Sequence, residues 1–450
     1  MKALLTAAAC AVSLSLSLGC SDGGGGGAPA NDAGPDGGTD AGADGGADPL
    51  AFPLTVAVLS DPHLYAESLG MSDPAAESLE SEPGLVIASE AILEATLESL
   101  VAADVDVALI SGDLTSNGEA ESHARMAELL AGLEAAGTAV YVVPGNHDVN
   151  NQYAVSYETY QTSVPGVTPE EFTGIYGAFG PSEAVSLDGG SLSYAAEPLP
   201  GLRLIMLDSG LFAGGYHLEG ALSDATLAWA TDQAAAAISA GSFPVAVMHH
   251  GLVEHVDSQD TYFPGFLLND HEAVATALAD AGLRLIFTGH YHTRDVSMLE
   301  TEAGAAIRDA ETGSLSIWPF PYRLVTLHAG GAVEIAPATT DAFDFDTGGQ
   351  ELDAWAQARL DVAFEAYLTA VAESYGLSAG QIAFAMPTMK DAWKAHLLGD
   401  EVYTEERQAA VAEIVAQGGM MVVAGSLIAK LYTDLEPADN ALELDLGIGE

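Results

Sequence analysis

Histidine, aspartate and asparagine side chains recur directly after short apolar runs of this sequence, and six of its 12 histidines stand in such places. Neutral imidazole together with carboxylate is the ligand set of Zn, Fe, Mn and similar ions. A lone histidine at a strand end is more often structural, but an Asp-x-His and a His-x-His in one chain favour a metal centre. The segments are Asp61-Pro62-His63, Gly112-Asp113, Gly145-Asn146-His147-Asp148, His249-His250 and Gly289-His290-Tyr291-His292.

These segments offer more ligands than one ion requires, and Asp113 is a natural bridge between two ions. Two ions about 3.5–4 Å apart could clamp a phosphoryl group and generate a hydroxide for in-line attack. Residues i and i+2 of an extended chain point to the same side, so we expect Asp61 with His63, and His290 with His292, each to serve one centre.

The elements that must position these residues are apolar runs that alternate with helical patterns, as in a mainly parallel α/β sheet. In such a sheet the reactive groups lie beyond the carboxyl ends of the strands. Residues 151–181, which have no clear period, are expected to form a lid or an active-site insertion. Strands are expected at residues 54–59, 105–110, 140–143, 191–197, 202–207, 244–248 and 283–287. Helices are expected at residues 90–102, 119–136 and 222–240. The apolar runs at 294–299, 305–309 and 322–335 are expected to form a second sheet.

Composition excludes several classes of protein. With 49% hydrophobic residues, the 450-residue chain can bury a sizeable core. Its 65 Asp and Glu against 12 Lys and Arg give a formal net charge of −53, which repels nucleic acid and anionic lipid. The two cysteines, Cys10 and Cys20, precede the folded part, which therefore has no thiolate nucleophile, disulfide or cysteine metal site.

Four regions are expected along the chain. Residues 1–20 are typical of a signal peptide, and the sequence around Cys20 is similar to a bacterial lipobox, with plain secretion as the alternative. Residues 21–50 form a Gly/Ala/Asp linker, 51–343 the catalytic domain, and 344–450 a helical C-terminal region. We therefore expect an exported protein that contacts the membrane only through an N-terminal lipid anchor; the oligomeric state is left open.

The five segments together, over residues 54–335, resemble the motifs of the calcineurin-like metallophosphoesterase family. The resemblance implies the α/β class, a four-layer αββα sandwich and a binuclear centre. It places the first ion on Asp61, His63 and His292. It places the second ion on Asn146, His249 and His290, with Asp113 as the bridge. The metals are left open among Fe, Mn, Zn and Co, divalent or trivalent.

The same resemblance makes His147 a group that contacts the substrate phosphate and protonates the leaving oxygen, with Asp148 orienting its ring. A histidine beside a carboxylate keeps its proton near neutral pH, which agrees with this role. Of the adjacent pair, His249 is the expected ligand because it leaves the strand directly. His250 is expected to line the pocket or contact phosphate.

The sequence departs from the motifs of some subgroups of this family, and these departures narrow the expected substrate class. Ser116 stands where a purple acid phosphatase has tyrosine, and residues 112–115 with 145–148 look more like bacterial phosphodiesterases. The expected activity is hydrolysis of small phosphodiesters. The alternatives are a phosphomonoesterase, a cell-surface binding protein with a vestigial metal site, and an attachment module with incidental activity.

A few residues are weaker candidates. Tyr65, Tyr216, His217 and Tyr291 could shape the substrate pocket, although ordinary packing explains them equally well. Arg323 could reach a phosphate, with a structural ion pair as the favoured alternative. The remaining histidines carry no predicted role.

Overall fold

The computed structural model describes residues 50–159, 161–399, 401–437 and 441–446. The expected signal segment, Cys20 and linker residues 21–49 lie outside these ranges. Within them, none of the helices combines the length and apolarity that crossing a membrane requires.

The first of two large sheets has six strands in the order β15-β14-β13-β1-β2-β3. Its three N-terminal strands are parallel and in register, with Val56 opposite Val107 and Ala108 opposite Val140. The other three are antiparallel to their neighbours. The strands are β1 (Leu54–Leu59), β2 (Val107–Ile110), β3 (Ala139–Val142), β13 (Pro321–Leu327), β14 (Ala332–Thr339) and β15 (Leu442–Asp445).

The second sheet has seven strands in the order β11-β12-β10-β9-β8-β7-β6. Its centre, β8, β9, β10 and β12, is parallel, and the edges are antiparallel. The strands are β6 (Ala184–Leu187), β7 (Tyr194–Ala196), β8 (Leu202–Leu207), β9 (Phe243–Met248), β10 (Leu285–Thr288), β11 (Asp295–Glu300) and β12 (Ala306–Glu311).

The sheets pack face to face, and side-chain alternation along β1 shows how. Val56 and Val58 belong to the apolar core between the sheets, which also holds Val245 and Phe287 of the second sheet. The intervening Ala57 and other outward residues pack instead against helices. Both faces of the central strands are therefore buried, which explains why these strands are continuous apolar runs in the sequence.

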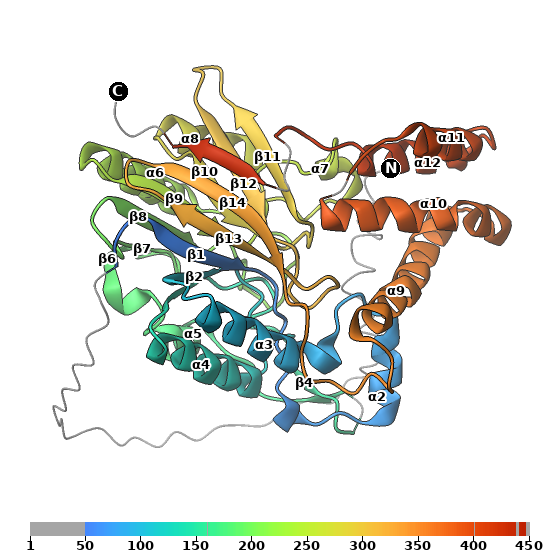
Figure 1. Cartoon of the computed structure of the whole chain (residues 1–450), viewed down its shortest axis with the longest axis horizontal. Helices are drawn as coiled ribbons and strands as arrows, with labels where there is room; N and C mark the ends of the chain where they lie inside the picture. The colour runs from blue at the N-terminus through green and yellow to red at the C-terminus, as the bar shows by residue number, and fades with distance from the viewer. Residues whose placement is uncertain (1–49, 160, 400, 438–440, 447–450) are drawn as a thin grey trace.

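Helices cover the two outer faces, so the expected four-layer αββα sandwich is confirmed (Figure 1). α3 (Ser89–Ala102) and α4 (Ala120–Ala135) cover the first sheet, and α6 (Asp224–Ser239) and α8 (His271–Asp280) cover the second. Shorter elements include α2 (Asp73–Ser78), β4 (Val155–Ser156), β5 (Thr162–Ser163), α5 (Pro169–Tyr176) and α7 (Gln259–Tyr262).

The C-terminal region is helical, as expected, but not throughout. α9 (Leu352–Ser374), α10 (Ala379–Leu398), α11 (Glu405–Val415) and α12 (Met420–Leu431) pack together and project to one side of the sandwich (Figure 1). After them the chain returns to the sandwich and β15 pairs with β14. A wholly helical region to residue 450 is therefore wrong, because the short strand gains its stability from a distant partner.

Two other expectations need correction. The hairpin β13–β14 belongs to the first sheet, where β13 pairs with β1, and not to a sheet with the runs at 294–299 and 305–309. Residues 151–181 are not simply a lid, because Phe172 and Tyr176 of α5 are buried in the core under the first sheet.

Candidate metal centre

The candidate ligands gather at one edge of the sandwich, where parallel strands of both sheets end. Asp61 follows β1, Asp113 follows β2 and Asn146 follows β3 in the first sheet. His249 follows β9 and His290 follows β10 in the second. The carboxyl ends of strands from two stacked sheets thus converge on one place, as the sequence predicted.

One cluster is formed by Asp61, His63 and His292, whose ligand atoms all lie within 4.8 Å of one another. Nε2 of His292 is 3.2 Å from Oδ1 of Asp61 and 3.4 Å from Nε2 of His63. The other carboxylate oxygen, Oδ2 of Asp61, accepts from the backbone N–H of His290 and from the Ser60 hydroxyl. Oδ1 is therefore the oxygen left to face the two imidazoles.

A second cluster is formed by Asp113, His249 and His290, again within 4.8 Å. Nε2 of His249 is 2.9 Å from Oδ1 of Asn146 and 3.3 Å from Oδ2 of Asp113. The same Asp113 oxygen is 3.7 Å from Nε2 of His63 in the first cluster. One carboxylate oxygen therefore stands between the two clusters, which is the position that a bridging ligand needs.

The backbone at this site adopts a conformation that L-residues rarely take. Asp61, His63, Asp113, His290 and His292 all have φ between 44° and 73°. Such strained positions tend to occur at functional sites, where surrounding structure holds them. The i, i+2 residues therefore do not meet through the alternation of an extended strand. His290 and His292 in fact serve different clusters, which corrects the expectation that this pair would share one.

Two glycines allow these loops to approach closely. A Cβ on Gly145 would lie 2.2 Å from both the backbone nitrogen and Oδ1 of Asp113. A Cβ on Gly289 would lie 1.8 Å from the Ser60 hydroxyl oxygen and 2.5 Å from Oδ2 of Asp61. The glycines of the two motifs are thus required by contact with a candidate ligand.

The protonation states suit metal binding at most of these groups. Burial lowers the pKa of His63 to about 4, and His147 and His292 add to the effect although Asp113 opposes it. Burial and the neighbouring His250 hold the pKa of His290 well below its usual value. Burial opposes ionisation of Asp113, but the adjacent His249 keeps its pKa well below the usual range. Uncharged imidazoles and ionised carboxylates are the forms that ligate metals.

His249, rather than His250, faces the centre. Nδ1 of His249 lies 2.9 Å from the carbonyl oxygen of Ser111, so its N–H donates there and leaves Nε2 for the site. Burial opposes protonation of His249, yet Asp113 and Asp61 raise its pKa to about 9, and a bound cation has to displace that proton.

His250 does not present a free nitrogen to a substrate. Its Nδ1 lies 2.8 Å from the Ser209 hydroxyl and its Nε2 lies 3.1 Å from the carbonyl oxygen of Leu218. The ring is fully buried and packs at 4.3 Å, centroid to centroid, on His290. The expectation that His250 contacts phosphate is therefore wrong, and its role is to support the ring of His290.

His147 lies beside the first cluster, and the centroid of its ring is 5.0 Å from that of His63. Its backbone N–H donates to Oδ1 of Asp113 at 2.8 Å. Its Nδ1 lies 2.8 Å from the carbonyl oxygen of Ser116 and 3.1 Å from Oδ1 of Asn117, so the Nδ1–H is donated to this pair. Nε2 is then the nitrogen that can reach a substrate.

Asp148 does not orient that ring, which corrects the sequence-based expectation. Its fully buried carboxylate accepts from the backbone N–H groups of Gly145 (2.8 Å), Leu114 (3.0 Å) and Thr115 (2.9 Å). It also accepts from the Thr115 hydroxyl at 2.9 Å. Asp148 therefore ties the loop after β3 to the loop after β2. The Ser116 carbonyl and Asn117 take the orienting role instead.

The weaker candidates separate into neighbours of the site and packing residues. The ring centroids of Tyr216 and His147 are 5.1 Å apart. Tyr291 is buried within the ligand loop, between His290 and His292. Tyr65 donates to the carbonyl of Gly70 and packs on Tyr157, and His217 bonds the carbonyl of Ala213. Arg323 is fully buried and donates to backbone carbonyls of Asp295 and Glu311, so it does not reach a phosphate.

Sequence reasoning missed several residues that hold this site together. Asn117 bonds the ring of His147, and Ser60 and Ser111 form a buried hydroxyl chain behind Asp61. Phe266 packs its ring 5.1 Å from that of His290. The run 116–118 directly follows a motif that was recognised, and this closeness was the signal for Asn117; nothing in the sequence pointed to Phe266.

The residues present fit a pair of metal ions. Oxygen and nitrogen atoms with free lone pairs converge in each cluster, and Asp113 touches both. In the described part of the chain these are the two groups of at least three such residues that come so close. Imidazole, carboxylate and amide donors without thiolate are typical ligands of Fe, Mn, Zn or Co.

The chain has distant similarity to several solved structures. No curated protein sequence matches the chain. Among solved structures, a dimetal phosphatase from Danio rerio is 14% identical and aligns over 65% of this chain and 97% of its own, with a TM-score of 0.45. A purple acid phosphatase from yellow lupin (Lupinus luteus) seeds is 11% identical over 65% and 52%, with a TM-score of 0.41. A Haemophilus influenzae NAD nucleotidase is 13% identical over 75% and 60%, with a TM-score of 0.36.

The family model for calcineurin-like phosphoesterases matches residues 54–294, which is more than half of the chain. The resemblance that the five motifs predicted is thereby confirmed. The chain belongs to the calcineurin-like phosphoesterase family and is a metal-dependent hydrolase of phosphoric esters.

Proposed function

We propose that this protein hydrolyses phosphoric diesters with two metal ions, held by Asp61, His63 and His292 and by Asn146, His249 and His290, with Asp113 between them. The observation that carries the proposal is the placement of Oδ2 of Asp113, within 3.7 Å of His63 and 3.3 Å of His249. Two adjacent ligand clusters that share one carboxylate are suited to two ions.

Bound metal ions would supply a hydroxide nucleophile at neutral pH and neutralise charge on the phosphoryl oxygens. The chain's own residues supply the rest. His147 binds the phosphoryl group through Nε2 and gives a proton from this atom to the leaving oxygen, while Ser116 and Asn117 hold its Nδ1–H. Tyr216 packs against the His147 ring and limits its rotation.

A diester fits the charge of this protein better than a monoester. A diester carries a single negative charge at neutral pH, whereas a monoester carries nearly two. Phosphomonoesters are commonly bound with the help of Arg or Lys, and this chain has 12 such residues against 65 Asp and Glu. Phosphomonoester hydrolysis remains the second candidate, because the same two metal clusters would serve either activity.

The proposal is tested by metal analysis together with hydrolysis of bis-p-nitrophenyl phosphate and p-nitrophenyl phosphate. We expect close to two metal ions per chain and the higher kcat/KM on the diester. His147→Ala should retain the metal and lower kcat by about 10²–10⁴. Loss of metal in His147→Ala would refute its role, and a metal-loaded protein that cleaves neither ester would indicate a binding protein.

We also propose that the enzyme is exported and held at the bacterial cell envelope by a lipid on Cys20. The support is the sequence pattern of residues 1–20 and the Gly-, Ala- and Asp-rich stretch that follows. Such an arrangement would hold the catalytic domain near a membrane surface.

A further inference from the structure

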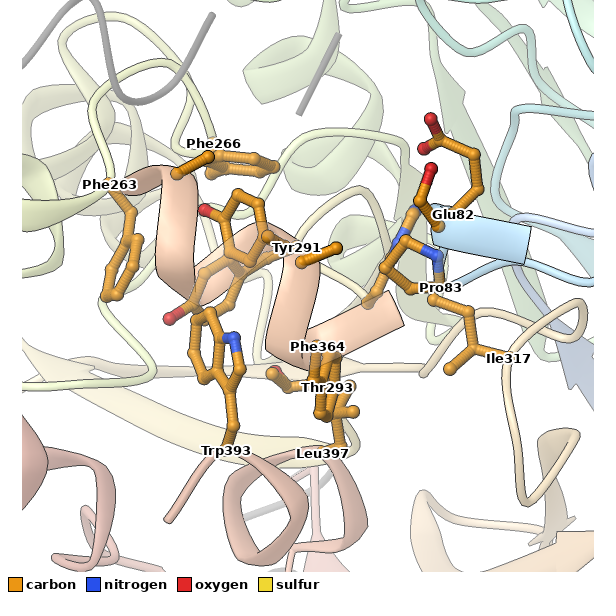
Figure 2. Close-up of a pocket in the computed structure, with 15 residues that line it drawn as sticks. Glu82, Pro83, Phe263, Phe266, Tyr291, Thr293, Ile317, Phe364, Trp393 and Leu397 are labelled. Carbon is orange, nitrogen blue, oxygen red and sulfur yellow. The ribbon is translucent and has the colours of Figure 1, made fainter. Parts of the chain in front are cut away.

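An apolar cavity of about 270 Å³ opens between the sandwich and the C-terminal helices. Figure 2 shows the side chains that line it. Six of the side chains that line it are aromatic, and they come from the loop after α7, from the ligand loop after β10, from α9 and from α10. They are Phe263, Phe266, Tyr291, Phe364, Tyr367 and Trp393.

This cavity borders the candidate metal centre. His292, a ligand of the first cluster, is itself one of the lining residues, and its side chain is 27% exposed. Phe266 of the cavity wall packs on His290 of the second cluster at 5.1 Å, centroid to centroid. A group bound at the metals therefore has an aromatic cavity directly alongside it.

A second and larger apolar cavity, of about 540 Å³, lies between α9, α10 and α12. It shares Phe263, Phe266 and Tyr367 with the first cavity. Its other lining residues are mostly aliphatic, among them Leu368, Val371, Leu427 and Leu431. At its rim Met420 and Val423 are 38% and 41% exposed, so apolar surface continues outward from the cavity.

We propose that the two cavities bind the aliphatic chain of an amphiphilic phosphoric diester, whose phosphoryl group sits at the metals. This rests on the proposed function and names its substrate class. An apolar cavity of ~150 Å³ already accepts benzene, and ligand sites are commonly ~300–1,000 Å³. The first cavity therefore has room for the proximal part of a long chain, and the aliphatic walls of the second have room for the remainder.

The reaction consumes one water. Its oxygen bonds to phosphorus as the bond from phosphorus to the leaving oxygen breaks, and the leaving oxygen takes up a proton. The chain-bearing substituent stays in the cavities during this step. The helical C-terminal region thereby acts as a wall of the substrate site, which gives a role to a part of the chain that the family match at 54–294 does not include.

The test uses alkyl p-nitrophenyl phosphate diesters with methyl, butyl, octyl and dodecyl chains, each below its micelle-forming concentration. In the wild type we expect kcat/KM to rise with chain length, by up to about fourfold for each buried methylene. A choline ester serves as the competing probe. A higher kcat/KM for the choline ester than for the octyl ester would assign the aromatic cavity to a quaternary ammonium group and overturn the proposal.

A matched pair of variants locates the chain. Ala370 is exposed on α9 and lines the first cavity, so Ala370→Trp narrows the cavity without burying the new ring in the core. We expect the dodecyl-to-methyl ratio of kcat/KM to fall at least tenfold. Ala358 is exposed on the same helix away from both cavities, and Ala358→Trp should leave the ratio unchanged. An unchanged ratio in Ala370→Trp would refute the proposal.

A binding measurement separates this inference from the proposed function. A dodecyl phosphate with a bromine-labelled chain should quench tryptophan fluorescence, and the quenching should be smaller in Trp393→Phe. Quenching without hydrolysis of any ester would refute the proposed function alone. Hydrolysis of the methyl ester without quenching and without a chain-length preference would refute the chain-binding cavities alone.

Discussion

Replacing Asp148 with Asn discriminates between two roles for this carboxylate. If Asp148 oriented His147, the variant would fold normally and lose turnover. In the structure its two oxygens instead accept from four donors on two loops, three of them backbone N–H groups. An asparagine can accept through one oxygen only, and its NH₂ group then faces donors that stay unpaired.

The size of the effect follows from these contacts. Whichever way the amide turns, its NH₂ faces two of the four donors, including at least one buried backbone N–H. Each unsatisfied buried donor costs about 1–3 kcal/mol. We therefore expect the free energy of unfolding to fall by about 2–5 kcal/mol, a large share of the roughly 5–15 kcal/mol that a protein typically has. Because Asp113 is attached to the same loop, metal content should fall as well.

The assay is urea unfolding, with metal analysis and kcat measured on the same preparations. It should be run at pH 8, because burial and the neighbouring Asp113 raise the pKa of Asp148 to about 7 and the wild type must be ionised. Asp224→Asn, at an exposed position in the first turn of α6, is the control. It should lower the free energy of unfolding by no more than about 1 kcal/mol and leave metal content and kcat unchanged. A variant with wild-type stability and metal content but much lower kcat would refute the anchoring role.

Three further predictions concern other parts of the chain. Gly289→Ala should lose metal and about 1–3 kcal/mol or more of stability by urea unfolding, because its Cβ meets a ligand carboxylate; Gly132→Ala, in the open interior of α4, should gain about 0.5–1 kcal/mol instead. Burial raises the pKa of Glu119 to about 7 from an ordinary 4.5, so its ionisation destabilises the fold as pH rises between these values. Unlike the oxygens of Asp148, Oε1 of Glu119 is buried without a hydrogen-bond partner, so its replacement by an amide leaves no donor there unpaired. Glu119→Gln should therefore add up to about 3 kcal/mol at pH 8 and little at pH 4, with exposed Glu98→Gln as the control. Cys20→Ala should abolish incorporation of labelled palmitate and release the protein from the envelope fraction; unchanged retention would refute the lipid anchor.

Much of the sandwich could be predicted because its central strands are buried on both faces and read as apolar runs followed by glycine and polar residues. The pairing partners of the antiparallel strands could not be predicted. β13 pairs with β1 across more than 250 positions of sequence, and β15 joins the same sheet only after four helices. Nothing local to these strands specifies which sheet edge they meet.

Helix boundaries in the C-terminal region show the same limit. Proline usually marks a helix boundary, yet Pro387 lies inside α10. The helix in fact begins at Ala379, because Ser378 and Gln381 form a capping box. Nearer the C-terminus, Gly418 and Gly419, both at positive φ, separate α11 from α12.

At the site, the residue types were predictable and the geometry was not. Carboxylate and imidazole side chains after strands indicated a metal centre, and the resemblance divided them between two ions. The left-handed backbone at five of them could not be located from the sequence, because Asp and His adopt it more often than most residues but still only rarely. Asp148 was misassigned because adjacency in sequence was taken for contact between side chains.

The C-terminal helices pack against the loop that carries two candidate metal ligands. Tyr291 sits between two candidate ligands in sequence, and its ring packs 5.5 Å from that of Phe266 and 5.5 Å from that of His396 on α10. Arg294, two residues after His292, donates to the carbonyl of Leu398 at the end of α10. The ligand loop is thus held from outside by this region. Deleting everything after residue 344 would also remove β15 from the first sheet. Point substitutions on α9 therefore test the role of the region more cleanly than truncation, because they leave both the loop and the sheet intact.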